Sequence, residues 1–249
     1  MYLLGDIGNT DVKICLYNKN YQLIKKIRID TNKISNNLLN KKLSKIILKK
    51  YKIKKIIFCS VVPAVYKKIK KTLKDKFNLR IIELKELKLS KIINIKVNKK
   101  QIGSDRLSNA ISVNDNKNNY IIVDFGTATT FDVVIKNNYL GGIISPGVNL
   151  SLKTLVSKAS MIPHIKLKSV NKILGKNTLE AVRSGFYWGY SGLIENIIRK
   201  ITKKTNKKFK IILTGGYAHL FKNRLSRKTM IQNNITIYGI IKIYKHFIK

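Results

Sequence analysis

The 249-residue sequence has few cysteines, few acidic residues and no long apolar segment. No stretch stays apolar over the ~20 residues that a membrane-spanning helix needs, so we expect no membrane insertion. No basic segment precedes the opening residues MYLLG, and Asp6 soon interrupts them, which argues against a signal peptide and for a cytoplasmic location. The two cysteines, Cys15 and Cys59, lie in strand-like segments, and we expect buried thiols rather than a disulfide or a metal site.

Acidic residues are outnumbered by basic ones. The chain has 12 Asp and Glu against 51 Lys and Arg, and its formal net charge is +39 at pH 7. Lysines occur from end to end, whereas arginine, the better reader of bases and phosphates, is scarce. We therefore expect mostly solvated lysines, non-specific polyanion binding at low salt and no specific nucleic-acid partner. The three histidines, His164, His219 and His246, have no metal-ligand spacing and are not expected to be catalytic.

Two segments share one pattern. YLLGDIGNTDVKICLY, from Tyr2, and YIIVDFGTATTFDVVI, from Tyr120, each contain an apolar run, an Asp, one residue, a Gly, a Thr-bearing turn and a second apolar run. A carboxylate at a strand end can hold Mg²⁺ or another cation, and the backbone of a Gly-containing turn can approach phosphate oxygens closely. Two such hairpins facing each other across a cleft would grip a nucleoside triphosphate. The alternative is a pair of ordinary β-turns, in which these residues are common.

The remaining pattern predicts an α/β protein in two parts. The polar segment 114–120 is a plausible boundary, which gives an N-terminal domain 1–115 and a C-terminal domain 116–249, each beginning with one of the two hairpins. Strands alternate with helices, and this alternation favours α/β layering. We expect strands at 2–6, 12–17, 21–30, 55–63, 79–84 and 210–216, and helices at 36–51, 64–76, 148–160 and 178–201, with a closing helical stretch.

Five motifs resemble those of a known family. No G-x-x-x-x-G-K-[ST] loop occurs, and no G-x-G-x-x-G follows a strand. Instead DIGNT near the N-terminus, IGSDR at 102–106, DFGTATTFD at 124–132, GGIISPG at 141–147 and TGG at 214–216 resemble the type III pantothenate kinases. These belong to the actin–hexokinase–chaperone ATPase superfamily. The resemblance implies an α/β fold of two ribonuclease H-like domains, each a mixed sheet flanked by helices, with the active site in the cleft between them.

The resemblance also implies an activity and the residues that perform it. The reaction would be ATP-dependent phosphorylation of pantothenate to 4'-phosphopantothenate, the first step of coenzyme A biosynthesis, by a homodimer that uses Mg²⁺ with ATP and K⁺ or NH₄⁺. ATP would contact Thr127 and the phosphate loop Asp6, Ile7, Gly8, Asn9, Thr10, Asp11, Val12 and Lys13. Pantothenate would contact Gly103, Ser104, Asp105, Arg106 and Thr178, with Asp105 as the catalytic proton acceptor. Asp124 would hold the monovalent cation, and Asp6 would lie near Mg²⁺.

Some alternatives stay open at this point. Ser104 or Asp105 can serve as the N-cap of the helix RLSNAISV, in addition to or instead of a chemical role. Lys96 stands where family members often carry a Tyr beside the substrate pocket. The functional alternatives are a kinase of another small hydroxylated substrate on the same fold and a Bvg accessory factor-like, nucleic-acid-associated regulator. The carboxylates at 6, 105 and 124 favour an enzyme, because a protein that only binds nucleic acid does not need them.

Overall fold

A computed structural model describes residues 1–48, 51–53 and 55–247. The chain forms two compact units, unit 1 (Met1–Asn114 with Asn234–Lys249) and unit 2 (Asp115–Asn233). The first boundary lies one residue from the division expected at 115/116. The second differs from the expectation, because the C-terminal helix belongs with unit 1 rather than with the second half of the chain.

The sheet of unit 1 is mixed. Its strands run in the order β3-β2-β1-β4-β5, antiparallel between β1 and β2 and between β2 and β3, and parallel between β1 and β4 and between β4 and β5. Their bounds are Tyr2–Ile7 (β1), Asp11–Tyr17 (β2), Leu23–Asp30 (β3), Lys55–Ser60 (β4) and Ile81–Glu83 (β5). The parallel strands β1, β4 and β5 therefore place their carboxyl ends at one edge of the sheet.

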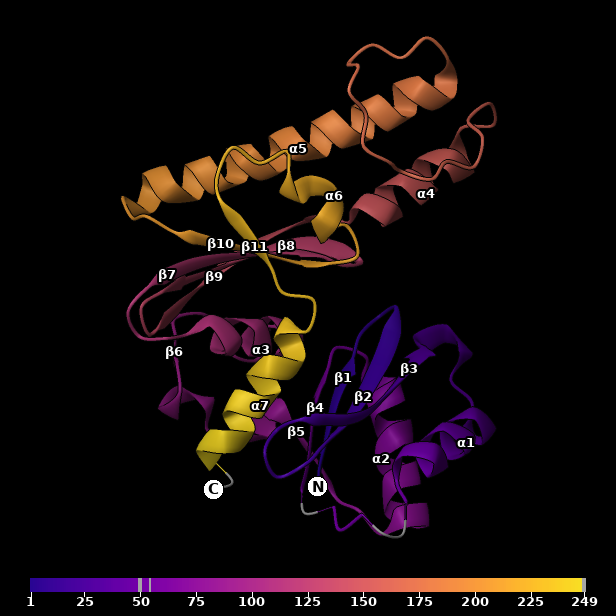
Figure 1. Cartoon of the computed structure of the whole chain (residues 1–249), viewed down its shortest axis with the longest axis vertical. Coiled ribbons are helices and arrows are strands. Elements are labelled where there is room, and N and C mark those ends of the chain that lie inside the picture. Colours follow the sequence, from indigo (N-terminus) through magenta and orange to yellow (C-terminus); the bar gives the residue numbers. More distant parts are fainter. Residues whose placement is uncertain (49–50, 54, 248–249) are drawn as a thin grey trace. The chain divides into compact units, whose positions relative to one another are not determined.

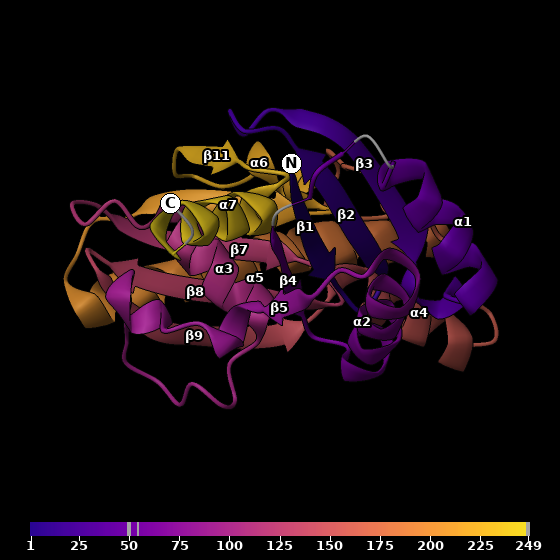
Figure 2. The same ribbon diagram turned by 90° about the horizontal axis from the view of Figure 1, so that it is seen from below.

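Helices cover both faces of this sheet (Figures 1 and 2). On one face, the apolar stripes of α1 (Asn36–Ile46) and α2 (Pro63–Phe77) pack on alternate residues of the strands, including Leu3, Ile7 and Phe58. On the other face lie α3 (Ser104–Val113) and α7 (Ile235–Phe247). Short elements complete the unit: η1 (Thr31–Lys33), η2 (Leu84–Glu86), η3 (Leu89–Lys91) and β6 (Asn94–Ile95).

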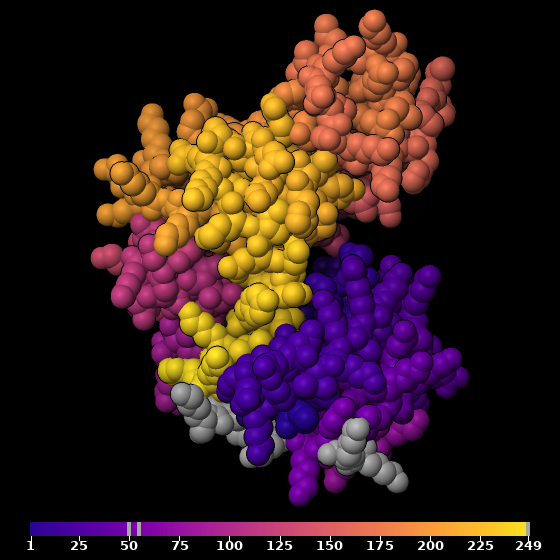
Figure 3. All heavy atoms as spheres, in the orientation of Figure 1, coloured from indigo at the N-terminus to yellow at the C-terminus, as the bar shows by residue number. Residues whose placement is uncertain are grey.

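Tertiary contacts explain why α7 belongs to unit 1. Gly239 of α7 lies directly against Ser108 of α3, whose hydroxyl donates to the carbonyl of Thr236 at 2.7 Å. At its other end α7 meets β1, where the rings of Tyr244 and Tyr2 lie 4.3 Å apart between centroids. Figure 3 shows the yellow atoms of α7 beside the indigo atoms of the N-terminal strands. These contacts join residues more than 100 positions apart, so no local sequence pattern predicts them.

The first helix ends earlier than its apolar spacing predicts. Apolar residues recur to Tyr51, but α1 ends at Ile46, and Ile47 has non-helical φ and ψ of −97° and 89°. Residues 49 and 50 of the expected helix lie outside the described residues. At the other end, Ser35 accepts from the amide of Leu38 at 3.2 Å and starts the helix as an N-cap.

Unit 2 repeats the strand order of unit 1. The strands β9-β8-β7-β10-β11 follow one another, with β7, β8 and β9 antiparallel and β7, β10 and β11 parallel. Their bounds are Asn119–Phe125 (β7), Ala128–Ile135 (β8), Asn138–Pro146 (β9), Lys210–Gly215 (β10) and Thr229–Ile231 (β11). Three helices pack on one face of this sheet through a single apolar cluster: α4 (Val148–Lys158), α5 (Thr178–Thr205) and α6 (Ala218–Lys222). The two similar sequence segments thus occupy equivalent hairpins, β1–β2 and β7–β8.

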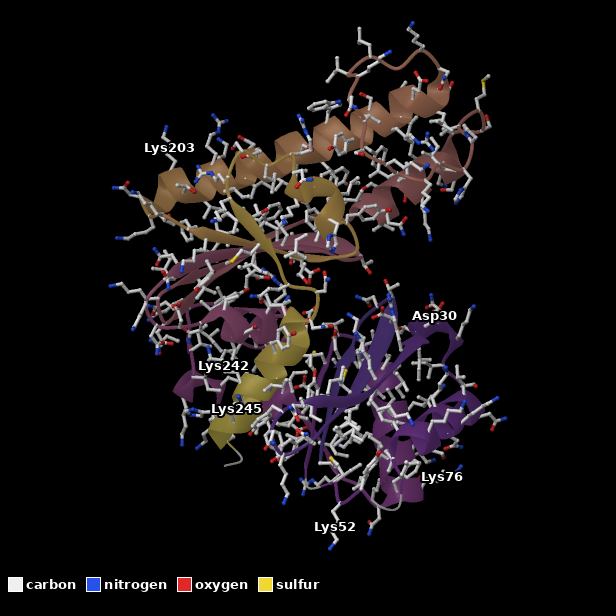
Figure 4. All side chains as sticks on the ribbon, in the orientation of Figure 1. Asp30, Lys52, Lys76, Lys203, Lys242 and Lys245 are labelled. Carbon is white, nitrogen blue, oxygen red and sulfur yellow. The ribbon has the colours of Figure 1, made fainter. Side chains whose placement is uncertain are left out.

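The lysines are distributed over both units. Those labelled in Figure 4 come from α2 (Lys76), α5 (Lys203), α7 (Lys242 and Lys245) and the segment before β4 (Lys52). Among the described residues, no helix is both long enough and apolar enough to cross a bilayer. Both cysteines are buried free thiols, as expected.

Candidate active site

The first hairpin joins β1 to β2 through residues 8–10. The amide of Gly8 donates to the carbonyl of Asp11 at 2.9 Å and closes the turn, while Asn9 and Thr10 are exposed at its tip. Thr31 braces the turn from η1, because its hydroxyl donates to the Gly8 carbonyl at 2.7 Å and its amide donates to the Thr10 carbonyl at 3.0 Å. No local pattern predicts this contact, since Thr31 lies 21 residues beyond the turn.

The residues of the expected phosphate loop have different environments. Ile7 and Val12 are fully buried and pair across β1 and β2, so their side chains belong to the core. The side chains of Asp6 and Lys13 also pair across the strands, with Lys13 Nζ 3.6 Å from Asp6 Oδ2 and 3.7 Å from Asp11 Oδ1. The loop therefore offers one exposed tip and one cation shared between two carboxylates.

Asp6 is a nearly buried carboxylate, 8% exposed. Burial raises its pKa above the ordinary value, and the nearby charge of Lys13 opposes this shift. Its other oxygen, Oδ1, accepts from the thiol of Cys59, whose sulfur lies 3.3 Å away on the adjacent strand β4. Burial, followed by the charge of Asp6, raises the pKa of this thiol, so Cys59 stays protonated and acts as the donor.

The GSDR motif forms the start of α3. Gly103 is the N-cap and makes no side-chain capping bond, so the hypothesis that Ser104 or Asp105 caps the helix is wrong. Ser104 is the first helical residue, 2% exposed, and its hydroxyl donates to Glu83 Oε1 at 2.6 Å. Asp105 follows, and its Oδ1 accepts from the amide of Arg106 at 2.7 Å. A Cβ on Gly103 would collide with Asp105 Oδ1. The observed position of the Asp105 carboxylate, directly against the Gly103 backbone, therefore requires glycine at 103.

The structure brings Asp105 and Asp6 into one electrostatic environment within unit 1. Burial raises the pKa of Asp105, and the amide and charge of Arg106 oppose the shift. The charge of Asp105 in turn contributes to the raised pKa of Asp6. Two carboxylates with raised pKa values, one at a strand end and one at a helix start, are typical of a functional site.

The second hairpin, in unit 2, joins β7 to β8. The amide of Gly126 donates to the carbonyl of Ala128 at 3.0 Å, which parallels the bond that closes the first hairpin. Asp124 is half-buried at the end of β7, and Thr127 is exposed at the tip. Gly215, at the end of β10, has a φ of +85°, and a Cβ there would lie 2.7 Å from Asp124 Oδ1 and 2.5 Å from the carbonyl oxygen of Phe125. The TGG motif is thereby explained, because its first glycine lets the backbone approach the Asp124 carboxylate.

Three further residues, Asp132 at the end of the DFGTATTFD motif, Thr178 and Lys96, have the following surroundings. Asp132 is fully buried and accepts from the hydroxyl of Tyr139 at 2.6 Å, so its environment is that of a structural carboxylate. Thr178 is the exposed first residue of α5, preceded by the N-cap Asn177, which accepts from the amide of Glu180 at 2.9 Å. The side chain of Lys96 is exposed just after β6.

The residues present fit cations that arrive with a nucleotide or bind to backbone oxygens. In the described part of the chain, no group of three or more His, Cys, Asp or Glu side chains could hold a metal ion. Mg²⁺ is commonly bound by one or two carboxylates together with substrate phosphates and water. Asp6 can supply one such carboxylate. In unit 2, Asp124 Oδ1 and the carbonyl oxygen of Phe125 both border the position that a Cβ on Gly215 would occupy, and oxygen atoms of these two kinds are ligands of hard cations.

Unit 2 also contains a cavity of about 410 Å³ between α4, the segment 164–167 and Tyr217. Its wall is mostly apolar, with Lys153, His164 and Lys166 at the edge. None of the site residues expected from the sequence lines it.

Comparison with known proteins gives concordant results. The family model described as type III pantothenate kinase matches residues 2–200. A type III pantothenate kinase from Pelagibacter ubique (strain HTCC1062) is 54% identical over 242 residues, which cover 97% of this chain and 98% of that protein. A solved structure from Campylobacter jejuni, named as a Baf family transcriptional activator, is similar with a TM-score of 0.65 at 22% identity, over 98% of both chains. Another, from Sinorhizobium meliloti and named as a 2-dehydro-3-deoxygalactonokinase, is similar with a TM-score of 0.64 at 8% identity, over 100% of both chains.

Two mixed sheets flanked by helices, and the similarity to solved structures named as sugar kinases, define the class: this is an α/β fold of two units, shared with those structures. The expected fold class is confirmed. Within that class, the chain belongs to the type III pantothenate kinase family.

Proposed function

We propose that this protein transfers the γ-phosphoryl group of ATP to the hydroxyl of pantothenate, in the first step of coenzyme A biosynthesis. The family match along nearly the whole chain supports a kinase. The observation that carries the proposal is the placement of Asp105 at the start of α3, within electrostatic range of Asp6 at the end of β1. Phosphoryl transfer needs positioned groups and charge neutralisation, and this pair of carboxylates supplies one group for the acceptor side and one for the phosphate side.

Asp105 is the proton acceptor in this proposal. Its carboxylate takes the proton of the pantothenate hydroxyl as that oxygen attacks the γ-phosphorus, and burial makes it a stronger base than an exposed Asp. The adjacent Arg106 pairs with an anionic group of the substrates. Gly103 and Ser104 form the backbone of the same turn, and Thr178 is a further pantothenate contact.

The first hairpin binds the phosphates of ATP. Its exposed tip, Asn9 and Thr10, presents backbone and small polar side chains, and Lys13 supplies a positive charge beside Asp6. Asp6 lies where it can help to hold Mg²⁺. When bound with ATP, this ion neutralises the negative charge that develops on the phosphoryl oxygens.

The second hairpin contacts ATP through Thr127 and holds a monovalent cation at Asp124. Support for the cation site comes from the position of Gly215, where a Cβ would lie 2.7 Å from Asp124 Oδ1 and 2.5 Å from the carbonyl oxygen of Phe125, so a carboxylate oxygen and a backbone oxygen border the same space. K⁺ and NH₄⁺ are both large, weakly hydrated cations that such an arrangement of oxygens can accept.

The protein acts as a homodimer in the cytoplasm in this proposal. Apolar side chains are exposed on unit 2, including Ile144 at 63%, Leu174 at 82% and Met161 at 90%. Association that covered such side chains would remove apolar surface from water, and this supports a dimer. Light scattering after size exclusion measures the mass: twice the 28.5 kDa chain mass supports the homodimer, and a monomer contradicts it.

The rival functions are less well supported. A kinase for another small hydroxylated substrate would share the fold and the two hairpins, so only substrate tests exclude it. The name of the similar Campylobacter jejuni protein suggests a regulator, but a likeness at 22% identity establishes the fold alone.

The proposal is tested with ATP, Mg²⁺ and K⁺ in a coupled assay of ADP release. Pantothenate, glycerol and a set of sugars are compared as acceptors at equal concentrations. We expect turnover with pantothenate well above the rate without acceptor. Faster ADP release with a sugar or glycerol would favour the rival kinase.

A further inference from the structure

Glu83 has a carboxylate whose two oxygens are both engaged. It ends β5, and its Oε2 accepts from the amide of Lys85 at 2.6 Å, which fixes the turn η2. Its Oε1 accepts from the hydroxyl of Ser104 at 2.6 Å. Hydrogen bonds to a charged acceptor are stronger than bonds between neutral groups, so this side chain joins the end of β5 firmly to the start of α3.

The joined turn is the one that carries Asp105. Ser104 is the first residue of α3, and its N-cap Gly103 has no side chain with which to fix the turn. The hydroxyl of Ser104 is therefore used to anchor α3 to the sheet, and at 2% exposure it is covered by protein. The Asp105 carboxylate follows on the next residue and moves with this turn.

The anchor lies at the edge of the sheet where Asp6 also lies. β1, β4 and β5 are parallel, Asp6 pairs with Cys59, and Phe58 pairs with Glu83. After burial, the charges of Asp6, Asp105 and Glu83 all raise the pKa of the Cys59 thiol, so the three carboxylates lie within electrostatic range of this one side chain. An anchor from Glu83 to α3 thus fixes Asp105 relative to strands that also hold Asp6.

We propose that Glu83 is a positioning residue for phosphoryl transfer, which acts through Ser104 to hold the first turn of α3 and with it the carboxylate that accepts the substrate proton. This inference rests on the proposed function. A misplacement of a reacting group by about 1 Å can cost ~10²-fold in rate. Loss of the anchor is therefore expected to lower kcat ~10- to 100-fold and to leave the KM for MgATP within about threefold of the wild-type value.

The test is a double-mutant cycle with a matched control. Glu83→Ala and Ser104→Ala each remove one side of the bond, and the double variant removes both. Glu86→Ala is the control, since Glu86 is an exposed carboxylate in the neighbouring turn η2 and its loss changes the net charge equally. Glu83→Gln keeps an acceptor oxygen for Ser104 and is expected to recover part of the activity lost in Glu83→Ala.

We expect the double variant to be no slower than the slower single variant, and Glu86→Ala to match the wild type. Additive losses would contradict the proposal, because Ser104 would then act on the substrate independently of Glu83. So would a Glu83→Ala variant as active as Glu86→Ala. If Glu83→Ala does not fold, as judged by circular dichroism, the kcat of Ser104→Ala is compared with that of Ser104→Ala/Glu83→Gln. Equal kcat values would support the proposal, and a further loss in the double variant would contradict it.

A second readout does not depend on turnover. Hydrogen exchange of the amides at residues 104–107 should be faster in Ser104→Ala and Glu83→Gln than in Glu86→Ala, because the first turn of α3 has lost part of its anchor. Equal exchange in all the variants would overturn the inference. A wild-type protein that is inactive on pantothenate contradicts the proposed function instead, and the exchange comparison still decides whether Glu83 fixes this turn.

Discussion

Replacement of Asp105 by Asn should have opposite effects on activity and on stability. Asn keeps the size of the side chain and an Oδ1 that can accept from the amide of Arg106, as Asp105 Oδ1 does at 2.7 Å. The first turn of α3 is therefore expected to persist. The negative charge and the basicity are lost, and these are the properties that the proposed proton acceptor needs.

The expected loss of turnover follows from the role of a general base. Such groups contribute ~10²- to 10⁴-fold, which corresponds to about 2.7–5.4 kcal/mol in activation free energy. Binding of MgATP should change by less than about threefold, because in the proposal the nucleotide contacts the hairpins rather than this carboxylate.

The stability of the variant follows from the direction of the pKa shift. Burial raises the folded-state pKa of Asp105 above the ordinary 3.8, so the ionised carboxylate is disfavoured in the folded state. A raised carboxyl pKa stabilises the protein below pH ~3.8, and this contribution is lost as the pH rises through the folded-state pKa. Asn does not titrate and has no such loss. At pH 7 the melting temperature of Asp105→Asn should therefore equal or exceed that of the wild type. The difference in melting temperature, variant minus wild type, should be larger at pH 7 than at acidic pH.

The assay combines ADP release at saturating pantothenate and ATP with thermal unfolding at pH 4 and pH 7. Near-normal turnover of the purified variant would refute Asp105 as the base. A loss of activity together with a lower melting temperature at pH 7 would instead show that the ionised Asp105 stabilises the fold, contrary to the effect expected from its burial.

Three further predictions concern the hairpins and the charge. Cys59→Ala removes the thiol that donates to Asp6 and should raise the KM for MgATP ~3- to 10-fold. Cys59→Ser keeps a donor, and Cys15→Ala removes the other buried thiol, so both should leave this KM unchanged. Equal KM values for all three variants would show that the Cys59–Asp6 contact has no part in binding MgATP. Activity should depend on K⁺ or NH₄⁺, and Asp124→Ala should weaken ATP binding measured by calorimetry, while equal rates in Na⁺ and K⁺ buffers would exclude the cation site. Binding to DNA of random sequence depends on counterion release, so its affinity should fall ~10³-fold or more between about 50 and 200 mM salt. Retention of one DNA sequence at 200 mM salt, with ~10³-fold preference over random DNA, would instead favour a regulator.

Local patterns predicted the two hairpins well. In each, an apolar run, an Asp and a Gly-containing turn are adjacent in the sequence, so strand, turn and carboxylate position follow from neighbouring residues. The repeated strand order of the two units bears out the similarity of these segments. The short strand β11 and the strand β9 were not expected, because Thr229–Ile231 is too short for a pattern and Asn138–Pro146 contains glycines that interrupt one.

Long-range contacts could not be predicted from the sequence. The anchor from Glu83 to Ser104 joins residues 21 positions apart, and a single Glu in a Lys-rich segment gives no signal of it. The thiol of Cys59 was expected to be buried, but its contact with Asp6 depends on the parallel pairing of β1 and β4. The C-terminal helix joins unit 1 through Gly239 and Ser108, a contact that only the folded chain reveals.

Identification of the reaction product decides whether this protein phosphorylates pantothenate. The purified protein is incubated with pantothenate, ATP, Mg²⁺ and K⁺, and the product is analysed by mass spectrometry and ³¹P NMR. We expect 4'-phosphopantothenate, with one phosphoryl group on the pantothenate hydroxyl and ADP formed in equal amount, and at least ~10²-fold less of this product from Asp105→Asn over the same time. Unchanged pantothenate beside an active phosphorylation of another acceptor would contradict this expectation.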